Sequence, residues 1–155
     1  MGSERIAGWL AFLVPAGLLG GALISQYGFG LYPCEMCIWQ RWPHLAAILF
    51  AIPALFRPDK GGSGLLIAAA ALAILASGLI GAFHAGVEYG WWEGLTSCAT
   101  TGAVSLDSIM DAPLVRCDVA PWSLFGISLA GYNFLLSAGG AILILVLLAK
   151  GRKGA

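Results

Sequence analysis

The sequence predicts an all-α integral membrane protein: a bundle of four transmembrane helices with two loops on the outer side. Of its 155 residues, 59% are hydrophobic and 10% are charged, whereas a soluble domain carries roughly 25% charged residues. The mean hydropathy is +0.87. The apolar residues form four long segments, and most basic residues lie on one side of them. We expect a single membrane domain, residues 1–155, with spans at about 6–27, 38–56, 64–85 and 123–149.

The first span, residues 6–27, is an apolar run of about 22 residues. A signal-peptide core is shorter, at roughly 7–15 residues, so this run is expected to stay as a transmembrane helix. Gly17 and Gly21 are spaced as a small-xxx-small pair, which lets another helix approach closely. Simple tolerance of glycine in a membrane helix explains them equally well.

The second span, about residues 38–56, follows a Cys-x-x-Cys pair, Cys34 and Cys37. Its purely apolar part is too short to cross a membrane. The helix must therefore include the preceding polar residues, and this places Arg41 just inside one membrane boundary. A helix that begins near Pro33 puts both cysteines and Arg41 on one face.

The third span, residues 64–85, ends at His84 and is followed by an aromatic stretch that resembles an interfacial belt. The outer loop after it, about residues 86–122, contains Cys98 and Cys117 and a predicted short surface helix around residues 104–110. The fourth span covers residues 123–149, with Ser137 and Ala141 as another small pair.

Four spans place both termini on the same side of the membrane. Six of the eight basic residues fall on that side, and the positive-inside rule makes it the cytoplasm. All four cysteines then lie outside, where an oxidising compartment permits disulfides. A net charge of zero argues against a nucleic-acid partner. The six cytoplasmic basic residues are Arg5, Arg57, Lys60, Lys150, Arg152 and Lys153.

The Cys-x-x-Cys pair is interpreted as a redox centre. The positive end of a helix and the charge of Arg41 both favour thiolates over thiols. A metal half-site is the alternative, but Cys98 and Cys117 are not spaced as a second half, and His44 is expected to point into the membrane. Cys98 and Cys117 form either a structural disulfide or an exchangeable pair that passes electrons to the first.

Two further residues allow more than one interpretation. Arg41 could extend to the lipid head groups, yet a charge inside a span is costly and tends to be functional. His84 is either an ordinary interfacial histidine or a hydrogen-bond donor or proton relay to a bound ring.

Three stretches of the chain resemble the disulfide bond formation protein B (DsbB) family of bacterial inner-membrane thiol oxidases. They are the Cys-Glu-Met-Cys-Ile-Trp-Gln-Arg run at residues 34–41, the segment from His84 to Cys98, and the segment from Arg116 to Gly126. The likeness covers nearly the whole chain, with periplasmic loops at about 28–37 and 86–122. Glu35 departs from the family, which often has apolar residues between the first two cysteines.

The resemblance implies a quinone-dependent protein-disulfide oxidoreductase of the inner membrane, with cytoplasmic termini and periplasmic cysteines. A periplasmic DsbA-like partner would attack Cys98, Cys117 would attack Cys34, and Cys37 would face ubiquinone or menaquinone beside Arg41. His84 would lie near the same ring. A vitamin K epoxide reductase-like enzyme is disfavoured by cysteine order. A paralogue with one dedicated substrate, or a structural subunit with inert disulfides, remains as an alternative.

Overall fold

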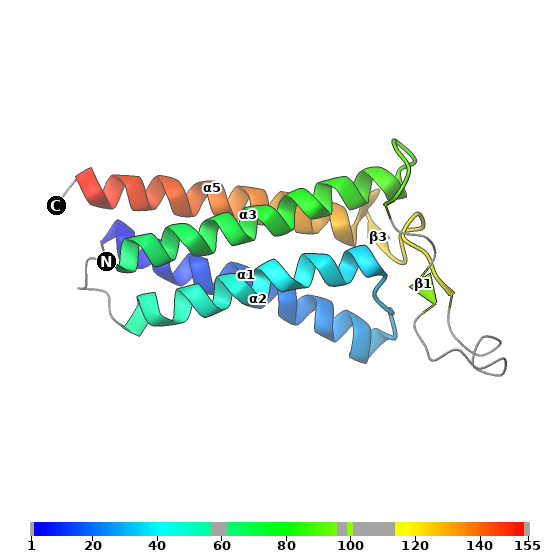
Figure 1. The fold of residues 1–155 in the computed structure, drawn as a ribbon, viewed down its shortest axis with the longest axis horizontal. Coiled ribbons are helices and arrows are strands. Elements are labelled where there is room, and N and C mark those ends of the chain that lie inside the picture. The colour runs from blue at the N-terminus through cyan, green and yellow to red at the C-terminus, as the bar shows by residue number, and fades with distance from the viewer. Residues whose placement is uncertain (1, 57–61, 96–98, 101–113, 154–155) are drawn as a thin grey trace.

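The computed structural model describes residues 2–56, 62–95, 99–100 and 114–153. Cys98 and the predicted surface helix around residues 104–110 lie outside this part of the chain. Four long helices run side by side along the molecule, and both termini lie at the same end (Figure 1). The helices pack mainly in the cyclic order α1, α2, α3, α5, and α1 also contacts α3 across the bundle. The helices are α1 (Ser3–Phe29), α2 (Glu35–Phe56), α3 (Ser63–Glu88) and α5 (Leu129–Lys153).

Three of these helices are long and apolar enough to cross a membrane: α1, α3 and residues Leu129–Gly151 of α5. Helix α2 falls below that standard because its first half contains Gln40, Arg41 and His44. It is nevertheless 22 residues long, about 33 Å, and packs along α1 and α3. The count of four spans therefore stays a prediction.

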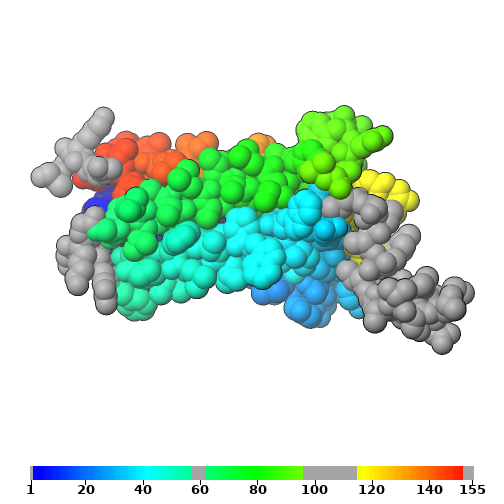
Figure 2. Space-filling view, viewed as in Figure 1, coloured from blue at the N-terminus to red at the C-terminus, as the bar shows by residue number. Residues whose placement is uncertain are grey.

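Apolar side chains cover the outside of all four helices. Leu13 on α1, Leu49 on α2, Leu72 on α3 and Ile142 on α5 are each more than half exposed. The space-filling view shows α2 and α3 closely packed along their length (Figure 2). A bundle with large apolar residues outside and small ones between its helices suits a lipid environment.

Small residues make the closest helix contacts, but not all of those that the sequence suggested. A Cβ atom added at Gly17 or Gly21 would meet no atom within 4 Å, so this pair does not bring another helix of the chain close. A Cβ atom at Gly78 of α3 would lie 3.0 Å from the Cβ of Ser137. Ser137 and Ala141 are fully buried, which fits the predicted small pair on the last helix.

The last helix starts at Leu129, six residues later than the predicted span. The preceding residues form a hairpin of β3 (Ser123–Leu124) and β4 (Ile127–Ser128). Both turn residues, Phe125 and Gly126, have positive φ, as in a type I′ hairpin. The Tyr89 hydroxyl ties this hairpin to the end of α3, since it donates to the Gly126 carbonyl at 2.9 Å.

A second short ladder pairs β1 (Ala99–Thr100) with β2 (Leu114–Val115), antiparallel. Both ladders lie at the end of the bundle opposite the termini (Figure 1). This end also holds the start of α2 and the end of α3, where the predicted site residues occur.

Candidate functional site

Cys34 and Cys37 lie together at the start of α2, and neither forms a disulfide in this structure. Cys34 Sγ donates a hydrogen bond to Cys37 Sγ at 2.8 Å, and the backbone N–H of Cys37 donates to Cys34 Sγ at 3.3 Å. The helix itself begins at Glu35, and the Cys34 carbonyl accepts its first hydrogen bond, from Ile38. Cys34 is therefore the residue that caps the helix.

The proton of this pair belongs to Cys34. The hydrogen bond to Cys37, together with burial, raises the pKa of the Cys34 thiol from 9.0 to about 12. The expected preference for a thiolate at the helix N-terminus does not hold for Cys34, because its pKa is raised. The arrangement suits a pair in which Cys34 holds the proton and Cys37 carries the negative charge.

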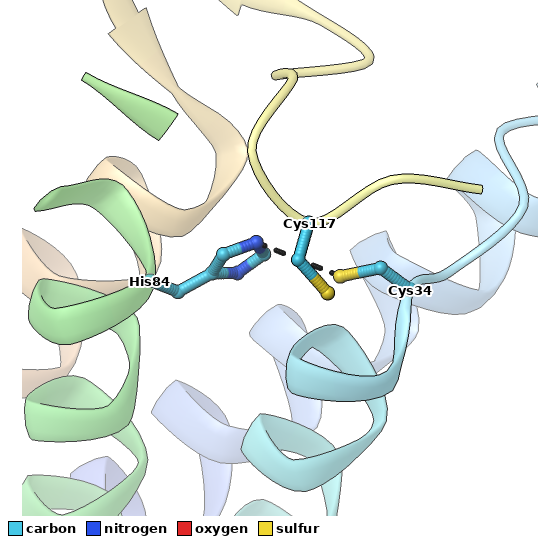
Figure 3. Close-up of side chains that lie close together, drawn as sticks. All are labelled: Cys34, His84 and Cys117. Carbon is cyan, nitrogen blue, oxygen red and sulfur yellow. Dashed lines mark hydrogen bonds between the residues drawn. The ribbon is translucent and has the colours of Figure 1, made fainter. Parts of the chain in front are cut away.

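A second group of side chains converges on Cys34 from distant parts of the chain (Figure 3). His84 Nε2 lies 3.5 Å from Cys34 Sγ. Cys117, buried in the segment after β2, places its Sγ so that all three atoms lie within 4.8 Å of one another. The structure thus brings together three of the predicted site residues, and Cys98 lies outside the described part of the chain.

A buried hydrogen-bond network begins at His84, and a backbone carbonyl determines which of its atoms donate and which accept. Gln40 Nε2 donates to the Met36 carbonyl at 3.1 Å, which identifies this atom as the amide nitrogen. The same nitrogen lies 2.9 Å from His84 Nδ1, which must therefore accept. The neutral His84 ring then carries its proton on Nε2, facing Cys34 Sγ and, at 3.7 Å, Glu88 Oε1.

This tautomer bears on the alternative that the cysteines bind a metal. Cys34, Cys117 and His84 offer two sulfur atoms and one nitrogen, a possible donor set for a metal ion. A ligating imidazole nitrogen must be unprotonated, however, and the network holds the proton on His84 Nε2. The geometry therefore favours hydrogen bonding from His84 to a sulfur over metal binding.

Asn133 extends the network to a second histidine. Its Nδ2 donates to the Ser77 carbonyl at 3.2 Å and to Gln40 Oε1 at 2.8 Å, so Oδ1 is its acceptor atom. Asn133 Oδ1 accepts from the Ser137 hydroxyl and lies 2.9 Å from His44 Nε2. The Ser77 hydroxyl, which donates to the Gln40 carbonyl, lies 2.9 Å from the same nitrogen. His44 therefore carries its proton on Nε2.

The expectation that His44 points into the membrane is wrong. Its side chain is only 3% exposed and faces the interior of the bundle. With its proton on Nε2, Nδ1 is a hydrogen-bond acceptor, and it has no partner among the described residues. Glu88 Oε2 is likewise buried without a partner in this part of the chain.

Two cavities meet at Cys37, which borders both of them. The inner cavity, about 250 Å³, is bordered by α1, α2, α3 and α5 and includes Cys37, Arg41 and His44 in its wall. The outer cavity, about 310 Å³, is bordered by Cys34 and by residues near Cys117. Five residues line both cavities: Leu31, Tyr32, Cys37, His84 and Pro121.

Arg41 lies in the wall of the inner cavity, on the same helix face as Cys37. Its Nη1 donates to Gln26 Oε1 of α1 at 2.6 Å. Because a guanidinium group has five N–H donors, others are available to a bound acceptor. The structure thus gives Arg41 a place beside a cavity, not only near the lipid head groups.

Sequence reasoning missed several polar residues of the site. Gln40, Asn133 and Glu88 all border the inner cavity. Glu88 is assigned from sequence to the outer loop, yet its side chain is only 2% exposed. The sequence signal that could have identified Gln40 and Asn133 is an amide side chain inside a predicted span. Such a group is costly in a membrane unless it has a hydrogen-bond partner.

The comparisons with known proteins agree on one family. A family model described as "Disulfide bond formation protein DsbB" matches residues 4–147. "Disulfide bond formation protein B" of Chromohalobacter salexigens is 35% identical over 151 residues, covering 88% of this chain and 84% of that protein. The protein of the same name from Aromatoleum aromaticum is 30% identical over 152 residues, covering 92% and 91%. No solved structure is significantly similar to the chain. With a match that spans nearly its whole length, the chain belongs to the DsbB family.

Proposed function

We propose that this protein reoxidises a periplasmic DsbA-like dithiol partner by thiol–disulfide exchange and passes the electrons to membrane quinone. The supporting observation is the position of Cys117, whose sulfur lies within 4.8 Å of Cys34 although the two residues are far apart in the sequence. Family membership and the three candidate spans support an integral membrane protein of disulfide bond formation.

The exchange begins at Cys98 and ends at Cys37. A thiolate of the reduced partner attacks Cys98 in the Cys98–Cys117 disulfide, and Cys117 leaves as a thiolate. The partner's second thiolate then attacks the mixed disulfide, so the partner leaves oxidised. Cys117 attacks Cys34 in the Cys34–Cys37 disulfide, and Cys37 leaves as a thiolate. Cys98 then attacks the Cys34–Cys117 bond, which restores the loop disulfide and leaves Cys34 and Cys37 reduced.

His84 and Cys34 handle charge and protons in these steps. The Nε2–H of His84 faces Cys34 Sγ, so it can stabilise negative charge as that sulfur becomes a leaving group. Once reduced, Cys34 keeps a proton and donates its hydrogen bond to Cys37. The resulting charge is concentrated on Cys37, which lines both cavities.

The inner cavity fits a quinone head group. Its walls are mainly apolar, and its polar groups are few and convergent, as in small-molecule sites. Arg41 would hold a ring oxygen, and Cys37 would be the electron donor. A bound quinone supplies an acceptor for two electrons and two protons. A DsbA-type dithiol, at about −120 mV, requires an acceptor with a higher reduction potential than its own, and glutathione at roughly −200 mV does not meet this requirement.

The deciding experiment follows the redox state of each cysteine pair. In Cys117→Ser, a small-molecule dithiol still reduces Cys34–Cys37, whereas a DsbA-like partner does not, because the connecting sulfur is missing. Thiol trapping with mass spectrometry distinguishes the pairs, and Ser123→Ala, outside both cavities, is the matched control. Normal reduction of Cys34–Cys37 by the partner in Cys117→Ser would show that electrons take another route.

The quinone step has a separate readout. With reduced partner present, the ultraviolet absorbance of a short-chain quinone decreases in the wild type and stays constant in Cys34→Ser and Cys37→Ser. Normal turnover in either variant would exclude this pair as the donor. Inert structural disulfides, in contrast, would give no trapped mixed disulfide with any partner.

A further inference from the structure

A chain of hydrogen bonds crosses the bundle and ends on the sulfur of Cys37. Asn133 Nδ2 donates to Gln40 Oε1 at 2.8 Å, and Gln40 Nε2 lies 2.9 Å from His84 Nδ1, which accepts. His84 Nε2 faces Cys34 Sγ at 3.5 Å, and Cys34 Sγ donates to Cys37 Sγ at 2.8 Å. The chain thus links α5, α2 and α3, and each member donates toward the redox pair.

Two backbone carbonyls beside this chain fix its direction. The Met36 carbonyl accepts from Gln40 Nε2 at 3.1 Å, and the Ser77 carbonyl accepts from Asn133 Nδ2 at 3.2 Å. Turning the buried Gln40 amide over would place its oxygen against the Met36 carbonyl and its nitrogen against the Asn133 nitrogen. Both contacts would leave buried polar groups unpaired, which is unfavourable, so Gln40 presents a donor to His84 Nδ1.

This direction keeps a proton on His84 Nε2. A neutral ring whose Nδ1 accepts must carry its proton on Nε2, and a charged ring carries a proton there in any case. Glu88 Oε1, 3.7 Å from Nε2, and the Cys117 backbone also face this ring, and as acceptors they favour the same position of the proton. His84 Nε2 is therefore a donor to Cys34 Sγ and is unable to take the proton of that thiol.

We propose that Gln40 is a positioning residue, which acts through His84 to raise the reduction potential of the Cys34–Cys37 pair. Asn133 holds the Gln40 amide in place. The inference rests on the proposed exchange function and adds to it the residues that set its driving force. Hydrogen bonds in a chain polarise one another, so a donor behind Cys34 makes its thiol a stronger donor to the negative charge on Cys37.

The oxidised pair gains nothing comparable from this chain. On reduction the disulfide takes up two electrons and one proton, the S–S bond breaks, the proton stays on Cys34 and the charge stays on Cys37. Before reduction there is neither a thiol proton nor a charge for the chain to stabilise. The chain therefore favours the reduced pair, which is then a better acceptor of electrons from Cys117.

The potential of the isolated pair tests this role without partner or quinone. The full-length protein is freed of quinone in detergent, and Cys98→Ala with Cys117→Ala leaves one pair to titrate. Thiol–disulfide buffers of defined ratio set the potential, and thiol trapping with mass spectrometry measures the reduced fraction. Gln40→Met keeps the length of the side chain without its amide. It should lower the potential by about 30 mV, a tenfold change in the equilibrium constant.

A double-mutant cycle separates positioning from damage to the fold. His84→Phe removes the donor to Cys34 and should lower the potential by a similar amount. Gln40→Met added to His84→Phe should lower it no further, because Gln40 acts only through His84. Ser137→Ala removes a different hydrogen bond to Asn133, so it is the matched control and should leave the potential unchanged.

The position of the ring protons provides a test that does not depend on the folding of any variant. The chain has two histidines, and the network places a proton on Nε2 of both. Nitrogen NMR of the reduced wild-type protein, with isotope-labelled histidine, should therefore show a protonated Nε2 in each ring.

The outcomes distinguish this inference from the proposed function. An unchanged potential in Gln40→Met, additive decreases in the double variant, or a His84 ring whose only proton is on Nδ1 would refute the role of Gln40. Each of these results leaves the exchange function standing, because none of the measurements involves the partner or quinone. Failure of the partner to reduce the Cys34–Cys37 pair in the wild type would instead refute the exchange function, while the shifts in potential would still establish the positioning role.

Discussion

Residue scale: the proton between Cys34 and Cys37 governs the chemistry of the pair. The raised pKa of Cys34 means that the folded protein holds one proton more than the unfolded chain between pH 9 and about 12. Its contribution to stability is complete below the ordinary pKa and declines as pH rises through this window. The same shift makes Cys34 a slow nucleophile in the reduced protein.

We expect alkylation of reduced Cys34 by iodoacetamide to stay slow at pH 9 in the wild type. In Cys37→Ala it should accelerate, because the hydrogen bond to Cys37 is the largest cause of the raised pKa. Mass spectrometry of the peptide that contains Cys34 measures the rate. In denaturant the two proteins should react alike, and equal rates in the folded state would contradict the assignment of the proton to Cys34.

Arg41→Ala should raise the apparent KM for quinone by about tenfold or more, because a hydrogen bond to a charged group contributes about 1.5–3 kcal/mol. Trapping of the mixed disulfide with the partner should not change, since Arg41 lines only the inner cavity. Steady-state quinone reduction measures the effect. Gln26→Ala removes the hydrogen-bond partner of Arg41 but not the charge of Arg41, so it should raise the apparent KM for quinone by less. An unchanged KM in Arg41→Ala would count against a role in ring binding.

The sequence relates the first two cysteines to Arg41, whereas it does not show the polar side chains that form hydrogen bonds around them. Cys34, Cys37 and Arg41 are close in the chain, so helix geometry alone relates them. Gln40 and Asn133 are separated by 93 positions, and their hydrogen bond exists only once α2 and α5 pack. His44 was misplaced for the same reason: a histidine in an apolar segment shows no direction until its partners are known.

Element scale: α1 contributes space to the site through its glycines. Gly17 and Gly21 both border the inner cavity, and a Cβ atom at either position meets nothing within 4 Å. Their spacing allowed either a close helix contact or simple tolerance of glycine in a membrane helix. In the structure such contacts occur instead on α3, at Gly78 and Gly81.

Gly21→Leu should therefore fill the inner cavity and raise the apparent KM for quinone severalfold, without unfolding the bundle. Gly20→Leu is the matched control, because Gly20 also has open space around it but does not border the cavity. Quinone reduction and thermal unfolding are compared for both variants. Equal effects of the two substitutions would mean that the ring binds elsewhere.

The helix boundaries show where local patterns stop being informative. Apolar composition identified the regions of all four helices, yet it did not separate the hairpin at residues 123–128 from the last helix. That turn depends on positive φ at Phe125, an uncommon conformation for a non-glycine residue, and on the distant Tyr89 hydroxyl. Hydropathy reports neither the backbone conformation at Phe125 nor the distant hydrogen bond from Tyr89.

Whole-molecule scale: the charge distribution predicts how the bundle is oriented in the membrane. The termini lie at one end of the bundle and the cysteine pair at the other (Figure 1). The positive-inside rule assigns the end with the termini to the cytoplasm. If α2 also crosses the membrane, the turn between α2 and α3 is cytoplasmic and the segment after α3 is periplasmic.

Alkaline phosphatase fusions in bacteria test this orientation, because the enzyme is active only when exported. A fusion after Gly62 should be inactive, and a fusion after Gly94 should be active. The Lys and Arg residues near the termini keep that end of the bundle in the cytoplasm, so replacing them should weaken the preference for this orientation. Activity after Gly62 together with inactivity after Gly94 would reverse the orientation and place the cysteines in the cytoplasm.

The side chains that border both cavities have a wider consequence: Leu31, Tyr32, Cys37, His84 and Pro121. They include one sulfur atom and one imidazole ring. Under the proposed function, electrons would pass from the outer cavity to the inner one through the Cys37 sulfur, so the protein partner and the ring would not have to touch each other.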